Sequence, residues 1–449
     1  MYTLMIIVFV LGYMAIALEH PLRIDKAASA LITGVLCWAI FVLGASDILT
    51  GNEEFLAQGF SVHHIPDLSH FIEHELLEHL SEIASILFFL LGAMTIVELV
   101  DAHEGFAVIT DRIKTTKKSK LLWIIAILTF FFSAALDNLT TSIVMISLLR
   151  KLIKDQKTRW LFAGIVIISA NSGGAWSPIG DVTTTMLWIG GQLETVTIIR
   201  ELIVPSLVAM LVPVTVMSFL LKGNVERPLR ANVAEHYTNP TTDFERNLVF
   251  IVGVLGLLFV PIFKTYTHLP PFMGMMLSLG VLWVVTEVIH RSKNQETKSH
   301  LSVIGVLQKI DTASVLFFLG ILLAVSSLQS AGQLGEMASL LDEKIGNIYT
   351  INMVIGLLSA IVDNVPLVAA AMGMYEIGAG DFATNGTFWQ FLAYCAGTGG
   401  SALIIGSAAG VAVMGLEKID FIWYLKKMSL LAILGYFAGA FTYIALQSL

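Results

Sequence analysis

The chain has 449 residues, of which 56% are hydrophobic and 13% are charged, with a net charge of −8 and a mean hydropathy of +0.80. Soluble domains carry roughly 25% charged residues, so this composition excludes an ordinary soluble protein, and the acidic balance argues against a nucleic-acid partner. The two cysteines, Cys37 and Cys395, lie in apolar runs and give neither a disulfide framework nor the spacing of a metal site. We therefore predict an all-α polytopic membrane protein without a cofactor.

Apolar runs long enough to cross a bilayer, which takes about 20 residues in a helix, recur along the whole chain. In the first half they fall at residues 2–19, 27–45, 82–100, 161–189 and 200–221. In the second half they fall at residues 247–263, 269–289, 311–330, 387–416 and 428–447. The first run lacks the basic start and the small-residue exit of a signal peptide, so we expect it to remain as a span.

The Lys and Arg residues indicate which loops face the cytoplasm, because these residues collect on that side of a membrane. The loops that hold 23 of the 26 Lys and Arg residues are 20–26, 101–120, 150–159, 222–246, 291–309 and 417–427. The loop 46–81 holds none and has seven acidic residues, among them Glu53, Glu54 and Asp67, so it should lie outside. The same rule places the N-terminus and the C-terminus outside.

Histidines gather in the same external loop. They are His63, His64, His70, His74 and His79. His70, His74 and Glu78 are spaced i, i+4, i+8 and would share one helix face. This pattern is typical of an amphipathic helix at the membrane surface, and a pH sensor or an adventitious metal site is the alternative. Further along, Glu98 lies near the inner end of its span, as a candidate proton relay or an interface residue.

The segment 121–149 is apolar between two basic flanks. The flanking residues are Lys117, Lys118 and Lys120 before it and Arg150, Lys151 and Lys154 after it. Both ends should therefore be cytoplasmic, yet its 29 residues are too few to cross twice, which takes about 40. We predict a re-entrant hairpin that turns at Asp137 and Asn138 near the midplane, where irregular backbone must be buried in protein or line a wet cavity.

A second copy of this motif follows in the second half of the chain. Asp137-Asn138 recurs as Asp363-Asn364, and Gly173-Gly174 recurs at the same offset as Gly399-Gly400. The second hairpin, at residues 348–378, has mainly acidic flanks and should enter from outside. Inverted repeats whose broken helices meet at the midplane are the plan of secondary transporters.

These patterns predict two repeats of opposite topology. The first spans residues 1–222, with its hairpin at 121–149 and a broken span at 161–189. The second spans residues 244–449, with its hairpin at 348–378 and a broken span at 387–416. Each repeat would have five transmembrane spans, one of them broken, plus one re-entrant hairpin. The polar residues 223–243 form the expected cytoplasmic linker.

Polar residues at the hairpin tips and at the Gly-rich breaks are candidate ligands for a cation. Ionisable groups deep in a membrane are costly and mark ion or proton paths, and hard cations prefer oxygen ligands. The candidates for cation and proton binding are Asp137, Asn138, Thr141, Asn171, Ser172, Asp181, Thr183, Thr184, Asp363, Asn364, Thr398 and Ser401. The expected Na⁺ ligands among them are Asp137, Asn138, Asp363 and Asn364.

Paired carboxylates suggest how such a site would exchange ions. Two carboxylates close together in a low dielectric cannot easily both ionise, so protons and sodium would compete for the same oxygens. Alternatively, each aspartate could cap a hairpin helix, and the hydroxyls could bond to their own helices. Duplication of the motif at symmetric positions favours the functional interpretation. The second half has Ser407 where the first has Asp181, so more ligands should come from the first half.

Over essentially its whole length the chain resembles the NhaD-type sodium/proton antiporters of the ion transporter superfamily. The most specific pieces are Leu136-Asp137-Asn138-Leu139-Thr140-Thr141 and Ser177-Pro178-Ile179-Gly180-Asp181-Val182-Thr183-Thr184, preceded by the segment 17–26. The resemblance implies Na⁺ and Li⁺ efflux coupled to proton entry, most active at alkaline pH, in a bacterial inner membrane. It also implies a homodimer whose hairpin-bearing domains move against a fixed scaffold.

Two other functions stay open. A dicarboxylate or arsenite carrier of the same superfamily is the nearer alternative, although similar dicarboxylate carriers have a neutral Ser-Asn-Thr where this chain has aspartate at both tips. An intramembrane aspartyl protease also uses two aspartates, but such enzymes resemble Gly-x-Gly-Asp, whereas this chain has Ile179-Gly180-Asp181. We therefore expect a transporter rather than an enzyme, and one driven by an ion gradient, since no nucleotide-binding loop is present.

Overall fold

The computed structural model describes residues 1–52, 55–56, 60–106, 108, 113–228, 241–294, 298 and 300–448. In this part of the chain the regular structure is helical, and the sole β-pairing is an isolated bridge between Lys117 and Asn224. Among the described residues, eight helices are long and apolar enough to cross a membrane. The chain is therefore an all-helical polytopic membrane protein. Most of the expected linker 223–243, together with Glu53 and Glu54, lies outside the described residues.

Seven of the eight long apolar helices lie where the hydropathy pattern predicts spans, because a helix satisfies its backbone polar groups internally in lipid, and the eighth, α8 (Lys118–Leu136), lies in the segment predicted as the first re-entrant hairpin. The eight helices are α3 (Lys26–Leu43), α6 (Ile65–Ala102), α8, α12 (Thr195–Leu220), α13 (Asp243–Thr267), α14 (Pro271–Ile289), α17 (Thr312–Ser330) and α24 (Ser429–Gln447). The predicted first span is the shorter apolar helix α1 (Tyr2–Ala17).

Helix α6 extends well beyond the predicted span at residues 82–100. It begins at Ile65, inside the segment expected to be a loop, and continues to Ala102. Pro66 lies in its first turn, and no other Pro or Gly occurs before Gly92, so nothing in the sequence interrupts the helix. At 1.5 Å per residue it is about 57 Å long, against a hydrocarbon core of about 30 Å.

Four pairs of helices are joined by short irregular segments at the predicted hairpins and broken spans. Helix α8 is followed by α9 (Asn138–Leu152), and α19 (Ile348–Leu358) by α20 (Asn364–Met374). Helix α10 (Gln156–Ala175) is followed by α11 (Val182–Ile189), and α21 (Thr387–Gly399) by η3 (Gly400–Ala402) and α22 (Ala408–Glu417). The remaining short helices are α2 (Glu19–Leu22), α4 (Ala45–Ile48), η1 (Leu49–Gly51), α16 (Val303–Leu307), α18 (Gln333–Lys344), η2 (Gly380–Phe382) and α23 (Phe421–Lys427).

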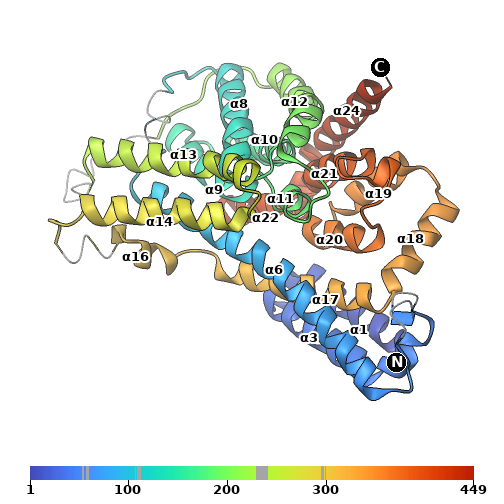
Figure 1. The fold of residues 1–449 in the computed structure, drawn as a ribbon. Helices are drawn as coiled ribbons and strands as arrows, with labels where there is room; N and C mark the ends of the chain where they lie inside the picture. The colour runs from blue at the N-terminus through green and yellow to red at the C-terminus, as the bar shows by residue number, and fades with distance from the viewer. Residues whose placement is uncertain are drawn as a thin grey trace.

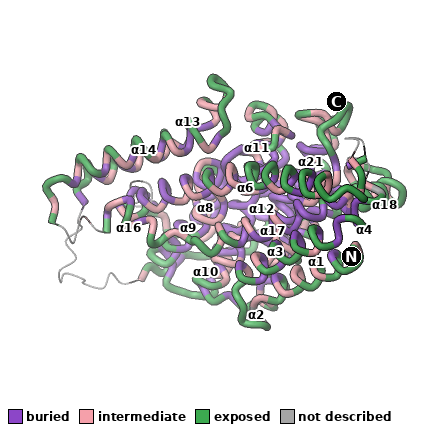
Figure 2. The backbone as a smooth tube through the Cα atoms, turned by 60° about the horizontal axis from the view of Figure 1, so that its bottom comes forward, coloured by how far each residue is buried: buried purple, intermediate pink, exposed green. Residues whose placement is uncertain are grey.

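The helices form a central body and a flanking layer (Figure 1). Helices α10 and α21 contact each other in the body, where α10 also contacts α8 and α9, and α21 also contacts α19 and α20. Helices α1, α3 and α17 pack together beside it, and α6 contacts α17 and α14. Figure 2 shows that exposed residues line the paired helices α13 and α14, whereas α10 is buried along most of its length.

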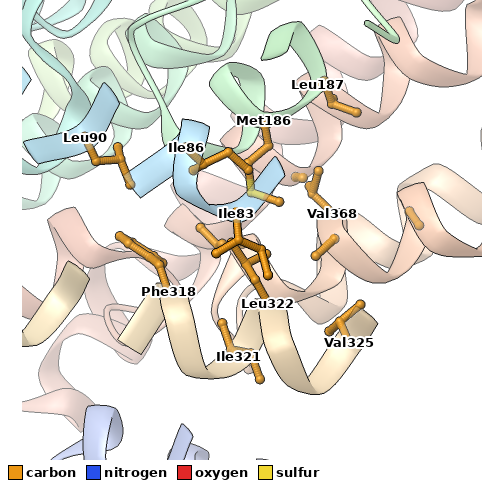
Figure 3. Packing of buried hydrophobic residues seen from close by; sticks show 14 of the residues in the cluster. Ile83, Ile86, Leu90, Met186, Leu187, Phe318, Ile321, Leu322, Val325 and Val368 are labelled. Carbon is orange, nitrogen blue, oxygen red and sulfur yellow. The ribbon is translucent and has the colours of Figure 1, made fainter. Parts of the chain in front are cut away.

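An apolar contact joins the flanking layer to the broken helices (Figure 3). Helices α6 and α17 contribute Ile86 and Leu322, and α11 and α20 contribute Met186 and Val368. These side chains are buried and belong to one hydrophobic cluster. Since burial of apolar surface is favourable, this contact stabilises the packing of the flanking layer against the broken helices.

Close backbone contacts in the first half repeat in the second half, at the offset that separates Asp137 from Asp363. A Cβ atom added at Gly173 would overlap the carbonyl oxygen of Phe130 in α8, and one at Gly399 would overlap that of Gly356 in α19. Glycine permits such close approach because it has no Cβ. The hydroxyls of Ser133 and Ser359 donate to the carbonyls of Ala170 at 2.5 Å and Ala396 at 3.4 Å. Each of these partners in the first half has its counterpart at the equivalent position of the second half.

Candidate functional site

The two duplicated aspartates lie at the breaks between helices. Asp137 separates α8 from α9, and Asp363 precedes α20. The first backbone N–H groups of a helix have no partner within it, and each aspartate accepts one of them. The Oδ1 atom of Asp137 is 2.7 Å from the N–H nitrogen of Thr140, and that of Asp363 is 3.3 Å from the nitrogen of Val365.

Asp137 adopts a backbone conformation that is unusual for a residue other than glycine. Its φ is +88° and its ψ is 159°. Residues in such sparsely populated regions cost on the order of 1–3 kcal/mol and persist only where the surroundings hold them. Here the hydroxyl of Thr140 donates to Oδ2 of Asp137 at 2.8 Å, in addition to the backbone bond to Oδ1. The carboxylate is therefore fixed in position at the helix break.

A buried network of amides and one carboxylate lies next to Asp137. The Nδ2 atom of Asn138 donates to Oδ2 of Asp181 at 2.6 Å and to Oδ1 of Asn171 at 3.1 Å. Asp181 is the N-cap of α11, where its Oδ1 accepts hydrogen bonds from the backbone nitrogen of Thr183 at 2.9 Å and its hydroxyl at 2.7 Å. Asn138, Asn171 and Asp181 are at most 5% exposed. The first half thus supplies a compact set of oxygen atoms.

The second half joins this network through serine hydroxyls. The Nδ2 atom of Asn171 is 2.9 Å from the Oγ of Ser401 and 3.0 Å from the Oγ of Ser407. Ser401 is a predicted site residue, and Ser407 is not. Ser407 stands in the second half at the position that corresponds to Asp181 in the first half, and this correspondence is the sequence feature that indicates it. One amide from α10 thereby connects the broken helices of the two halves.

The remaining candidate hydroxyls fall into two groups. Those of Ser172 and Thr398 donate to the carbonyls of Ile168 and Tyr394, each at 2.6 Å, as membrane hydroxyls commonly do. The other group, Thr141 and Thr184, has buried hydroxyls without a hydrogen-bond partner among the described residues. Leaving a buried polar group unsatisfied costs about 1–3 kcal/mol. Oxygens of this kind are suitable ligands for a hard cation.

Asp363 has a neighbour that the sequence motif does not indicate. Its Oδ2 is 3.0 Å from Nζ of Lys26, the first residue of α3. Asn364 follows it and is 4% exposed. Lys26 lies 337 positions from Asp363, so no spacing in the sequence could pair them. A cation of the protein itself is therefore held at the second aspartate.

The outlying candidates are separate from the network. Glu98 is half-buried on α6, and none of the hydrogen bonds found among the described residues joins it to Asn138 or Asp181. On the same helix, ligand atoms of His74, Glu75 and Glu78 lie within 4.8 Å of one another. The predicted helical spacing of the histidine-rich segment is confirmed, and the choice between a surface helix, a pH sensor and a metal site stays a prediction.

Comparison with known proteins shows the family. Residues 13–386 match the family CitMHS, described as citrate transporter. "Sodium/proton antiporter 1" and "Sodium/proton antiporter 2" of Arabidopsis thaliana are 47% and 44% identical; each match covers 99% of this chain, and 72% and 99% of the respective relatives. The Na⁺/H⁺ antiporter NhaD of Vibrio cholerae is 31% identical over 96% of this chain and 89% of its own length. The similarity to NhaD-type antiporters is confirmed, and the chain belongs to the citrate transporter family.

Proposed function

We propose that this protein is a secondary transporter that exchanges cytoplasmic Na⁺, and also Li⁺, for external H⁺. The observation that carries the proposal is the buried network of Asn138, Asn171 and Asp181 beside the fixed carboxylate of Asp137. The names of the antiporters that match nearly the whole chain support the same activity. These relatives are named as transporters, and nothing in the network calls for a bond-breaking reaction.

The chemistry of exchange follows from competition for oxygen atoms. Asp137, Asn138, Asp363 and Asn364 are the proposed Na⁺ ligands, with Asp181 as a further carboxylate. Na⁺ binds to ionised carboxylates, whereas a bound proton makes a carboxylate neutral. Binding of Na⁺ and binding of H⁺ at the same carboxylates therefore exclude each other. The unpartnered hydroxyl of Thr141, on the first turn of α9, would complete the coordination of a bare cation.

The proposed architecture is a pair of inverted repeats, residues 1–222 and 244–449. The glycine and serine contacts that recur at equivalent positions of the two halves support the duplication. In this proposal α8 with α9, and α19 with α20, form re-entrant hairpins that reach the midplane from opposite sides. The broken helices and hairpins would then move as one body against a scaffold of the flanking helices, within a homodimer.

The location and the orientation of the chain are further parts of the proposal. The distribution of Lys and Arg supports external N- and C-termini. The bacterial NhaD relatives support a bacterial inner membrane, while the relatives from Arabidopsis thaliana belong to a plant. In either kind of membrane, exchange of Na⁺ for H⁺ would link the pH inside to the sodium gradient.

An anion carrier is the second candidate, because the family is described as citrate transporter. Citrate, succinate and other carboxylates need positive or neutral surroundings, and arsenite needs a site for a neutral or anionic oxyacid. The network instead joins the carboxylate of Asp181 to the side chain of Asn138, which directly follows Asp137 in the chain. Fixed negative charge repels an anion and attracts a cation, so the geometry favours the cation.

The test uses purified protein in liposomes with an imposed pH gradient and a trapped pH-sensitive dye. We would add Na⁺, Li⁺, K⁺, succinate or citrate at several pH values. Rapid collapse of the gradient by Na⁺ or Li⁺ is the expected result. Accumulation of labelled succinate or citrate, without a response to any cation, would replace the antiporter by the anion carrier.

A further inference from the structure

An ion pair joins α3 to the start of α20 at one of the two duplicated aspartates. Nζ of Lys26 lies 3.0 Å from Oδ2 of Asp363, and the two side chains are 22% and 13% exposed. The same ammonium lies 4.3 Å from the centre of the Phe317 ring of α17. A cation placed over an aromatic face and beside a carboxylate is held by both. Lys26 of α3 and Phe317 of α17 thus hold a positive charge beside Asp363.

The two oxygens of Asp363 have different roles. Oδ1 caps α20 through the backbone nitrogen of Val365, and Oδ2 accepts the hydrogen bond from Lys26. At Asp137 both oxygens are engaged by Thr140 instead, and no ion pair involves Asp137 in the described part of the chain. The oxygen of Asp363 that a transported cation would approach is therefore the one that Lys26 occupies.

Two cavities beside Lys26 offer its ammonium group a position away from Asp363. A cavity of about 340 Å³ is lined by Glu19, Lys26 and Asp363. A second cavity of about 210 Å³ is lined by Lys26 together with Glu19, Asp25 and Asp311. A flexible lysine side chain can therefore leave Asp363 and still remain near carboxylates, so separation of the ion pair does not leave a charge without a partner.

We propose that Lys26 is a tethered cation that occupies Asp363 until a transported cation displaces it. This inference rests on the proposed Na⁺/H⁺ exchange. One carboxylate oxygen that faces a confined space cannot hold two cations, because they repel each other at close range. Binding of Na⁺ at Asp363 therefore requires the ammonium of Lys26 to move away.

Displacement of Lys26 would also change how α20 is held. Helices α17 and α20 contact each other, and their buried side chains, among them Leu322 and Val368 in Figure 3, belong to one apolar cluster, whose burial is favourable but weakly directional. The ion pair is the polar link that fixes the start of α20 to α3. Occupation of Asp363 by Na⁺ would thus release α20 from α3, and so couple ion binding to movement between the two layers.

The test measures binding of radioactive ²²Na⁺ to purified protein in the variants Lys26→Gln and Lys26→Met. We expect the half-saturating Na⁺ concentration to fall by about tenfold, an effect within the range of one close charge pair. Lys26→Arg retains a tethered cation and should not lower it. In an Asp363→Asn background, Lys26→Gln should have no further effect, because the ion pair is already absent.

Lys264→Gln is the matched control. Lys264 is also partly buried and lies 4.6 Å from the centre of an aromatic ring, that of Trp188, but its ammonium donates to a backbone carbonyl rather than to an aspartate. Its replacement should leave the half-saturating concentration unchanged. A wild-type value in both neutral variants of Lys26, or an equal shift in Lys264→Gln, would overturn the inference. Wild-type protein that neither binds nor exchanges Na⁺ would count against the proposed function instead.

Discussion

The two aspartates occupy equivalent positions in the two halves, yet their surroundings differ. Asp137 has a positive φ, and Thr140 engages both of its carboxylate oxygens. Asp363 has an ordinary φ of −48°, caps α20 through one oxygen and binds Lys26 through the other. The same Asp-Asn motif therefore lies in two different environments.

The difference comes from the residues on either side of each aspartate. Thr140 in the first half corresponds to Pro366 in the second, and proline has neither a hydroxyl nor an N–H to offer. Asp181 likewise corresponds to Ser407, so the second half has one fewer carboxylate near its break. The first half thus has two carboxylates at its helix breaks, whereas the second half has one, which Lys26 of α3 neutralises. That most of the cation ligands come from the first half stays a prediction.

The largest expected effect is loss of exchange when either aspartate is neutralised. Asp137→Asn and Asp363→Asn should each lower the rate of Na⁺-driven proton movement by more than about 100-fold, because an amide can neither bind a proton in exchange nor balance the charge of Na⁺. Liposome assays at equal protein incorporation measure the rate. Asp155→Asn is the control, since Asp155 caps α10 through Thr158 outside the network. Normal exchange in both test variants would refute the site.

The next effect concerns the fold that both halves share. Gly399→Ala and Gly173→Ala place a Cβ against the backbone carbonyls of Gly356 and Phe130. Overpacking typically costs about 1–3 kcal/mol and more where backbone must move, so both variants should melt at lower temperature in detergent. Gly415→Ala is the control, because a Cβ there meets nothing within 4 Å. Equal melting of all three variants would show that the close approach is unimportant.

A smaller effect is expected when Asp137 loses its hydrogen bond from the hydroxyl of Thr140. Thr140→Val removes the hydroxyl bond to Asp137 but retains the backbone N–H. We expect the KM for Na⁺ to rise by about three- to tenfold, since one hydrogen bond to a charged group contributes about 1.5–3 kcal/mol before compensation by neighbouring groups. Thr158→Val, at the cap of α10, should leave the KM unchanged. A KM that stays at the wild-type value in Thr140→Val would contradict the role given to Thr140.

The smallest effect tests a contact between the halves that lies away from both aspartates. The Nε2 atoms of His103 and His290 are 2.7 Å apart, and Nδ1 of His103 is bonded to the carbonyl of Leu99 at 2.6 Å. Burial just beyond the end of α14 lowers the pKa of His290 from 6.5 to about 4. Protonation of His290 is therefore unfavourable in the folded protein. The contribution of this site to the free energy of unfolding is present above pH 6.5 and is lost as the pH falls toward 4.

His290→Gln should flatten that loss. The melting temperature of the variant should decline less than that of the wild type between pH 6.5 and pH 4, because one fewer buried imidazole has to become charged. The pH dependence of exchange should not change, since in the proposed mechanism the aspartates rather than the histidines hold the exchanged proton. A shift in the pH profile of exchange in this variant would show that the His103–His290 contact, and not the pair of aspartates, controls the pH dependence of exchange.

The sequence determined the features that depend on neighbours along the chain. Hydropathy predicts the long helices because a bilayer accepts only apolar segments of sufficient length. The motifs at Asp137 and Asp363 predict the helix breaks, and Asx residues cap such helix starts through bonds to nearby N–H groups. The constant offset between the duplicated motifs leads one to expect that a close contact in one half recurs in the other, as the contacts of Gly173 and Gly399 do.

Tertiary structure alone decided the contacts between residues far apart. The amide of Asn171 reaches Ser401 and Ser407 in the other half, and Lys26 reaches Asp363 across 337 positions. Asp137 has a positive φ and Asp363 has not, so the residue type and its motif do not decide this conformation. Patterns of neighbouring residues in the sequence do not indicate these pairings, because the pairings arise only when packing brings separate helices together. The charge environment of the second aspartate is therefore a property of the folded chain.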